Sequence, residues 1–112
     1  MPNTFVNAKD ADLTTSLATL YTAPTSSGNV AIVLGVCIAN KNAASRTITL
    51  EWQDASDSSA ATQLLSGVTI PGNSTLEILE GAKIILMASD VLRSKASAAS
   101  SLDITVSLME VT

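Results

Sequence analysis

The feature that most constrains this chain is a run of ten apolar or small residues, Val30–Ala39, whose side chains alternate in size. Its even-numbered positions are all large, whereas its odd-numbered positions are mostly small, namely Ala31, Val33, Gly35, Cys37 and Ala39. A period of two indicates a β-strand, and apolar side chains on both faces indicate a strand covered on both sides. The run is also too short to cross a bilayer, which needs about 20 residues.

Shorter runs with β-strand character follow one another along most of the chain. They are separated by Gly, Pro, Asn, Asp and Ser, which favour turns. The predicted strands are 16–21, 30–39, 46–53, 63–70, 74–79, 83–87, 91–97 and 102–111. About eight strands at this spacing predict an all-β fold, an antiparallel β-sandwich with either a jelly-roll or an immunoglobulin-like layout.

The connections between these runs carry more specific signals. Pro71, Gly72 and Asn73 predict a type II turn, with proline at the first central position and glycine beside it. Gly81 interrupts the next apolar run. The nine residues 54–62 are mostly polar and predict an exposed tip. A calcium site at 54–58 is the alternative, although the spacing and the closing glutamate of an EF-hand are absent.

The first fifteen residues differ from the rest, because they are mostly polar with isolated apolar side chains. We therefore divide the chain into an N-terminal arm, residues 1–15, and a β-sandwich domain, residues 16–112. The arm is either a flexible terminus or a segment that becomes ordered when Phe5 and Val6 dock on a neighbouring subunit. The first five residues contain neither a basic nor a long apolar region, so we expect no secretory signal.

Composition excludes several classes of function. Charged residues make up 14% of the chain and only six are basic, for a net charge of −4. This balance argues against nucleic acid as a partner. The chain has no histidine and one cysteine, Cys37, so zinc sites, disulfides within the chain and Cys–His nucleophiles are not expected. The serines lack an evident activating base. We predict no enzyme, no catalytic or metal-binding residue, no cofactor and no membrane partner.

A few side chains admit both a structural and a binding interpretation. Trp52 is in phase with Ile48 and Leu50, which favours core packing over a ligand platform. Arg46 and Arg93 are either contacts at the rim of an interface or part of a solvated strand face. Cys37, on the small-residue face of its strand, is interpreted as a small packed hydrophobe.

Several segments resemble small structural proteins of tailed bacteriophages. The resemblance covers about Leu20 to Val111, and its clearest segments are 20–24, 36–40, 68–74, 88–90 and 102–111. Such proteins are often head decoration, or cement, proteins. These are small β-sandwiches that clamp neighbouring capsid subunits, commonly as trimers. The resemblance carries no catalytic residues with it.

The resemblance implies a non-enzymatic virion protein that binds the outer head surface and stabilises the capsid lattice. Its partners would then be the major capsid protein and further copies of itself, as a homotrimer. The protein would be made in the host cytoplasm and located on the capsid surface. The alternative is a tail or fibre component that acts as a receptor-binding or adhesion module.

The strand at 30–39 also predicts where a partner binds. Its small-residue face cannot be left in water without exposing an apolar stripe, and the polar segment 54–62 is a poor cover. We therefore expect a second subunit to cover it, and replacement of Ala31 or Val33 by lysine to dissociate the oligomer without unfolding the chain. The interface residues predicted from the sequence are Phe5, Val6, Ala31, Val33, Arg46 and Arg93.

Overall fold

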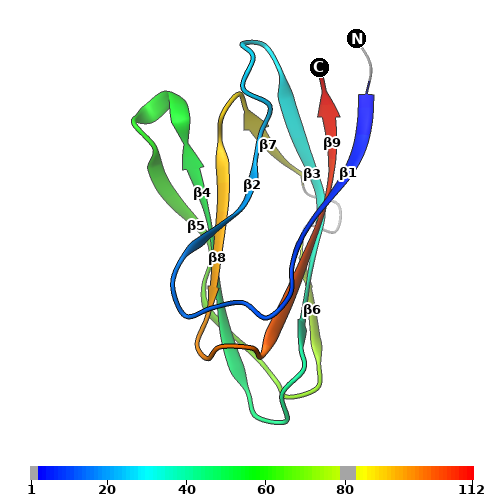
Figure 1. Cartoon of the computed structure of the whole chain (residues 1–112), viewed down its shortest axis with the longest axis vertical. Helices are drawn as coiled ribbons and strands as arrows, with labels where there is room; N and C mark the ends of the chain where they lie inside the picture. Colours follow the sequence, from blue (N-terminus) through cyan, green and yellow to red (C-terminus); the bar gives the residue numbers. More distant parts are fainter. Residues whose placement is uncertain (1–2, 79–82) are drawn as a thin grey trace.

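The computed structural model describes residues 3–78 and 83–112 and consists of two antiparallel sheets packed face to face (Figure 1). Leu79 and Gly81, which belong to a predicted strand and a predicted break, lie outside the described residues. The strands are β1 (Asn3–Asp10), β2 (Ala18–Thr22), β3 (Val30–Asn40), β4 (Arg46–Asp54), β5 (Ala60–Ile70), β6 (Thr75–Ile78), β7 (Ile84–Met87), β8 (Val91–Ala96) and β9 (Leu102–Val111). The predicted β-sandwich is confirmed, and a single 3-10 turn, Ala55–Asp57, follows β4.

The strand order identifies the layout as a jelly roll. One sheet has the order β1-β9-β3-β6, with β7 also paired to β3, and the other has the order β2-β8-β4-β5. Strands from the two halves of the chain pair from the outside inward: β1 with β9, β2 with β8, β3 with β6 and β7, and β4 with β5. This nested ribbon, rolled so that β9 also meets β3 and β8 also meets β4, is the double Greek key of jelly rolls.

The core lies between the two sheets and is made of aliphatic side chains that alternate along the strands. In β9 the alternate residues Leu102, Ile104, Val106 and Leu108 are buried, as the sequence pattern predicts. Ile48 and Leu50 of β4 and Leu92 of β8 face them from the second sheet. Only one face of each strand contributes to this core. Each sheet therefore also has an outer face, whose side chains are available for other contacts.

The predicted phase of β3 is wrong for half of the strand. A β-bulge at Leu34 inserts one extra residue opposite β9, where Val33 pairs with Leu108 and Gly35 already pairs with Ser107. An extra residue reverses which face each later side chain occupies. The inward residues are therefore Ala31 and Val33 before the bulge and Val36 and Ile38 after it. The outer face of β3 consequently mixes large and small side chains.

Residues 3–10, part of the predicted arm, form an edge strand of the first sheet. All eight residues of β1 pair with β9, from Asn3 opposite Val111 to Asp10 opposite Ile104. β1 begins and β9 ends at the same end of the sandwich (Figure 1). Leu13, just after this strand, is buried and bonds through its backbone to Leu102.

Two predicted connections differ in detail from the structure. Gly72 does not adopt a positive φ, so the turn is not type II; the left-handed residue is Asn73, at φ 56°. The polar tip is shorter than 54–62, because β4 continues to Asp54 and β5 starts at Ala60. The Asp54 carboxylate accepts hydrogen bonds from the Ser56 backbone N–H and hydroxyl and so caps the 3-10 turn.

Candidate functional site

The outer face of the β2-β8-β4-β5 sheet is polar and carries an ion pair between Arg93 and Glu51. Arg93 of β8 lies beside Glu51 of β4 and donates from Nε to its carboxylate at 2.7 Å. Glu51 is buried beneath this contact. Thr49 and Lys95 are the next outward pair along the same strands. This face offers a hydrated surface without an exposed large hydrophobic side chain among the described residues.

The outer face of the other sheet is apolar over half of its length. Phe5, Met109, Ile32 and Ile85 lie opposite one another across β1, β9, β3 and β7, and we call this set the Phe5 level. The next level toward the strand ends contains Val111, Val30 and Met87, with Asn3 at the edge. We call the surface formed by these two levels the apolar face; its residues are Phe5, Val30, Ile32, Ile85, Met87, Met109 and Val111.

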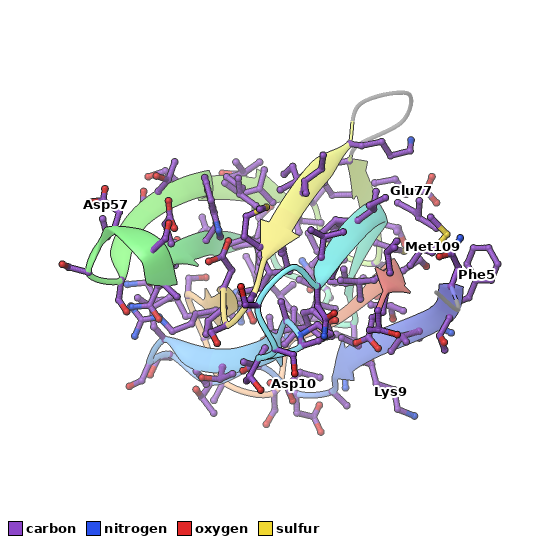
Figure 2. All side chains as sticks on the ribbon, turned by 90° about the horizontal axis from the view of Figure 1, so that it is seen from above. Phe5, Lys9, Asp10, Asp57, Glu77 and Met109 are labelled. Atoms are coloured by element: carbon purple, nitrogen blue, oxygen red, sulfur yellow. The ribbon has the colours of Figure 1, made fainter. Side chains whose placement is uncertain are left out.

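The apolar face holds the most exposed large hydrophobic side chains of the described residues. Phe5 is 76% exposed, Ile85 is 55% exposed and Met87 is 51% exposed. Figure 2 shows Phe5 and Met109 projecting side by side from this face of the molecule. A contiguous apolar surface of this kind marks an interaction site in a soluble protein.

A hollow lies on the same face next to the β3 bulge. It has a volume of about 210 Å³ and lies over β9, β3 and β6. Gly35 leaves space there, because a β-carbon at this position would meet no atom within 4 Å. The lining residues are Leu34, Gly35, Val36, Cys37, Glu77, Ile78, Thr105 and Ser107. Cys37 is thus a half-buried thiol facing outward rather than a core residue.

At the hollow, the same face becomes polar and carries opposite charges at its two edges. Lys9 of β1, Thr105 of β9, Cys37 of β3 and Glu77 of β6 lie opposite one another, and we call this set the Lys9 level. Lys9 and Glu77 are both exposed, and neither forms an ion pair within residues 3–78 and 83–112. The face therefore has an apolar half and a half with one positive and one negative edge.

The residues predicted as interface are dispersed. Phe5 lies on the apolar face, but Val6 points to the inner side of β1, beside buried Leu108. Ala31 and Val33 are 0% and 1% exposed, because the second sheet covers them and no partner is needed to do so. Lysine at either position would unfold the chain rather than dissociate an oligomer.

Both arginines are engaged within the chain. Arg93 pairs with Glu51, and Arg46 donates from Nε to the Ser101 hydroxyl at 3.2 Å and from Nη1 to the Ser45 carbonyl at 3.0 Å. These contacts tie neighbouring strands and loops together, and both arginine side chains are partly buried.

The residues that make most of the apolar face were missed by sequence analysis. They are Val30, Ile32, Ile85, Met87, Met109 and Val111. One signal was present: the alternation of β9 puts Met109 and Val111 on the same face as Thr105 and Ser107, away from Leu108. No comparable signal marks Ile32, because its orientation depends on where the bulge in β3 falls.

The buried Asp90 carboxylate holds the end of β4 and the end of β7 together. Asp90 accepts hydrogen bonds from Trp52 Nε1 at 3.0 Å and from the backbone N–H groups of Ala55 and Met87, each at 2.9 Å. This contact supports the structural interpretation of Trp52, whose ring also packs against the core. Among the described residues, no group of three His, Cys, Asp or Glu side chains could hold a metal ion.

One charged cluster lies at the end of the sandwich opposite the chain termini. Lys41 forms ion pairs with Asp12 and, at 3.1 Å, with Asp103. The backbone N–H of Asp12 also donates to Asp103 at 2.9 Å, and this bond, followed by Lys41, holds the pKa of Asp103 below its usual value. Of the described residues, no helix is long and apolar enough to cross a membrane.

No known protein family and no curated protein matches the sequence. The fold, however, is similar to that of several solved proteins. A chain from the capsid of Helicobacter pylori bacteriophage KHP30 aligns with a TM-score of 0.59 and 9% identity, over 97% of this chain and 87% of that one. A chain of the cyanophage Pam1 capsid asymmetric unit aligns with a TM-score of 0.51 and 21% identity, over 96% and 83%.

A third similar chain comes from Bacillus endospore appendages, described as disulfide-linked pili. It aligns with a TM-score of 0.54 and 13% identity, covering 100% of this chain and 91% of that one. At these identities the likeness establishes the fold alone. These three chains come from two capsids and a pilus, and they are only slightly longer than the chain described here.

Proposed function

We propose that this chain is a non-enzymatic structural protein of a bacteriophage virion, a decoration protein that binds the outer head surface and stabilises the capsid lattice. The observation that carries the proposal is the apolar face. It is an exposed surface on a small jelly roll, and nothing else among the described residues gives this surface a role. Chains of similar length and fold in the KHP30 and Pam1 capsids support it. Its partners would be the major capsid protein and further copies of this chain, in a homotrimer.

The composition of the surface fits a protein that acts by contact. Alanine, serine and threonine are abundant, and such short side chains lose little conformational entropy when a partner orders them. Few charges also lower the cost of removing water from a contact. Many copies bound to one lattice can then stabilise it although each contact is weak.

The test is binding to isolated heads. Purified protein is added to heads and, separately, to tails of the phage whose genome encodes this chain, and each is sedimented. We expect saturable binding to heads and a higher temperature of DNA release from the decorated heads. Binding to tails alone, or to neither particle, would contradict the proposal.

A tail or fibre adhesion module remains the second candidate, and the side chains argue against its usual form. Glycan sites commonly present aromatic platforms, but the Trp52 indole bonds to Asp90 and the Tyr21 hydroxyl bonds to Glu110. Phe5 is the one strongly exposed aromatic side chain of the described residues. A glycan array probed with and without calcium should therefore show no binding.

A further inference from the structure

We infer that the apolar face is covered by a second copy of this chain, with the β1 edge of one copy meeting the β6/β7 edge of the next. The two copies are related by a rotation axis parallel to the strands of this sheet. The inference rests on the self-association in the proposed function and names the surface that performs it.

The need for a cover follows from the Phe5 level. Phe5 and Ile85 are its two most exposed members, and Met109 and Ile32 join them across the sheet. No other side of the described chain presents large hydrophobic side chains of comparable exposure. Sheets that pack face to face bury such side chains in a layer about 10 Å thick.

The register of the strands allows this face to match the same face of a second copy. Rotation about an axis parallel to the strands keeps each residue at its own level along them. The Phe5 level of one copy therefore meets the Phe5 level of the next, with β1 of one against β7 of the other. Phe5 would contact Ile85 of the second copy, so that apolar side chains meet apolar side chains.

The charges at the Lys9 level agree with the same axis. Lys9 and Glu77 lie at opposite edges, three strand spacings apart, or about 14 Å, and are too distant to pair within one chain. The axis brings Lys9 of one copy to Glu77 of the next. Figure 2 shows Glu77 projecting on the same side as Phe5 and Met109.

A two-fold axis across the strands is less favourable. It keeps each residue on its own strand and reverses the levels. The result depends on where the axis crosses the strands. Lys9 would face a second Lys9, or the Phe5 level would face the polar Lys9 level, or the two charges would lie outside the contact between the copies. Only the axis parallel to the strands matches the apolar side chains and the charges together.

The first experiment reverses these charges and measures self-association by analytical ultracentrifugation. Lys9→Glu and Glu77→Lys should each raise the self-dissociation constant about tenfold or more, because like charges would meet. The double variant should restore wild-type assembly. Lys95→Glu, on the opposite outer face, and Asp57→Lys, at the tip, are controls with the same changes of charge and should assemble as wild type.

Mixing the two single variants determines the order of the axis. In a mixed pair, each contact joins residue 9 and residue 77 of opposite charge, so a two-fold dimer is fully restored. A ring of three must contain one contact between like copies, so a trimer is restored only by the double variant.

The reactivity of the Cys37 thiol reports on assembly of the wild-type chain itself, without any substitution. The thiol lies at the Lys9 level and is half-buried in the single chain. Its modification by a small thiol reagent should slow several-fold as wild type assembles, and should stay fast in Ile85→Lys, which places a charge on the apolar face. Circular dichroism establishes that this variant folds, since Ile85 is exposed.

Three results would overturn the inference: a wild-type monomer at high micromolar concentration, an Ile85→Lys variant that assembles normally, or charge-reversed variants that behave as the controls. None of these results concerns heads. Failure of the self-contact is therefore distinguishable from failure of the proposed function, which the head-binding assay measures separately.

Discussion

A β-carbon added to Gly72 would lie 2.0 Å from the carbonyl oxygen of Ala43. The turn after β5 therefore packs directly on the loop between β3 and β4, backbone against backbone. Asn40 fixes the same junction, donating from Nδ2 to the carbonyl oxygens of Ile70 and Pro71. Glycine is needed at position 72 because a side chain there would collide with the backbone of Ala43. Its backbone conformation does not require glycine, since its φ is not positive.

We expect Gly72→Ala to lower the free energy of unfolding by about 2 kcal/mol, because one of two backbone segments must move. Gly35→Ala is the matched control, since its new methyl group would enter open space. It should leave stability unchanged or raise it by up to about 1 kcal/mol. Urea denaturation of both variants measures the difference, and equal losses would contradict this account.

Most of the fold could be predicted from the sequence, because alternation and turn residues act locally. The strands from β2 to β9 were located in this way, and the sandwich follows from their number. The bulge at Leu34 could not be located, because it depends on how β9 pairs with β3 from the far end of the chain. Part of the candidate site was missed for the same reason, since the outward position of Ile32 depends on that pairing.

The bulge leads to a prediction about two neighbouring positions. Ala31→Lys should destabilise the chain by at least about 4 kcal/mol, because it buries an unpaired charge in the core. Ile32→Lys should leave the monomer folded, because Ile32 lies on the outer face and is only partly buried. Thermal unfolding followed by circular dichroism compares the two. A folded, stable Ala31→Lys variant would show that the assigned phase is incorrect.

Ser94 provides a test of core polarity. Its hydroxyl is buried and has no hydrogen-bond partner among the residues that the structure describes. An unsatisfied hydroxyl is costly, so Ser94→Ala should maintain or raise the free energy of unfolding, by about 1 kcal/mol at most. Ser97→Ala is the contrasting variant, because the Ser97 hydroxyl accepts the backbone N–H of Thr47 at 3.0 Å. Its loss should destabilise the protein.

The lowered pKa of Asp103 predicts part of the loss of stability in acid. Its pKa is lowered by the Asp12 N–H and by Lys41, so its carboxylate stabilises the fold above its ordinary pKa of 3.8. That contribution is lost as the pH falls through the lower pKa of the folded state. Asp103→Asn should therefore be less stable than wild type at neutral pH, and the difference should shrink in acid. Denaturation at a series of pH values measures it.

The raised pKa of Tyr21 predicts a loss of stability in alkali. Burial, and then the hydrogen bond of 2.5 Å to Glu110, raise the pKa of its phenol well above the ordinary value of 10.0. A raised pKa means that the stabilisation is complete below pH 10 and declines above it, where the unfolded chain loses the proton first.

Because Tyr21 is the only tyrosine, ultraviolet absorbance of the phenolate follows its ionisation directly. The phenolate should appear at higher pH in the folded protein than in urea. Glu110→Gln should lower the folded-state pKa of Tyr21 only partway, because burial remains as the larger cause. Tyr21→Phe should cost about 1 kcal/mol at neutral pH, and the difference from wild type should narrow above pH 10. Identical phenolate titrations in the folded and unfolded chains would contradict the buried contact between Tyr21 and Glu110.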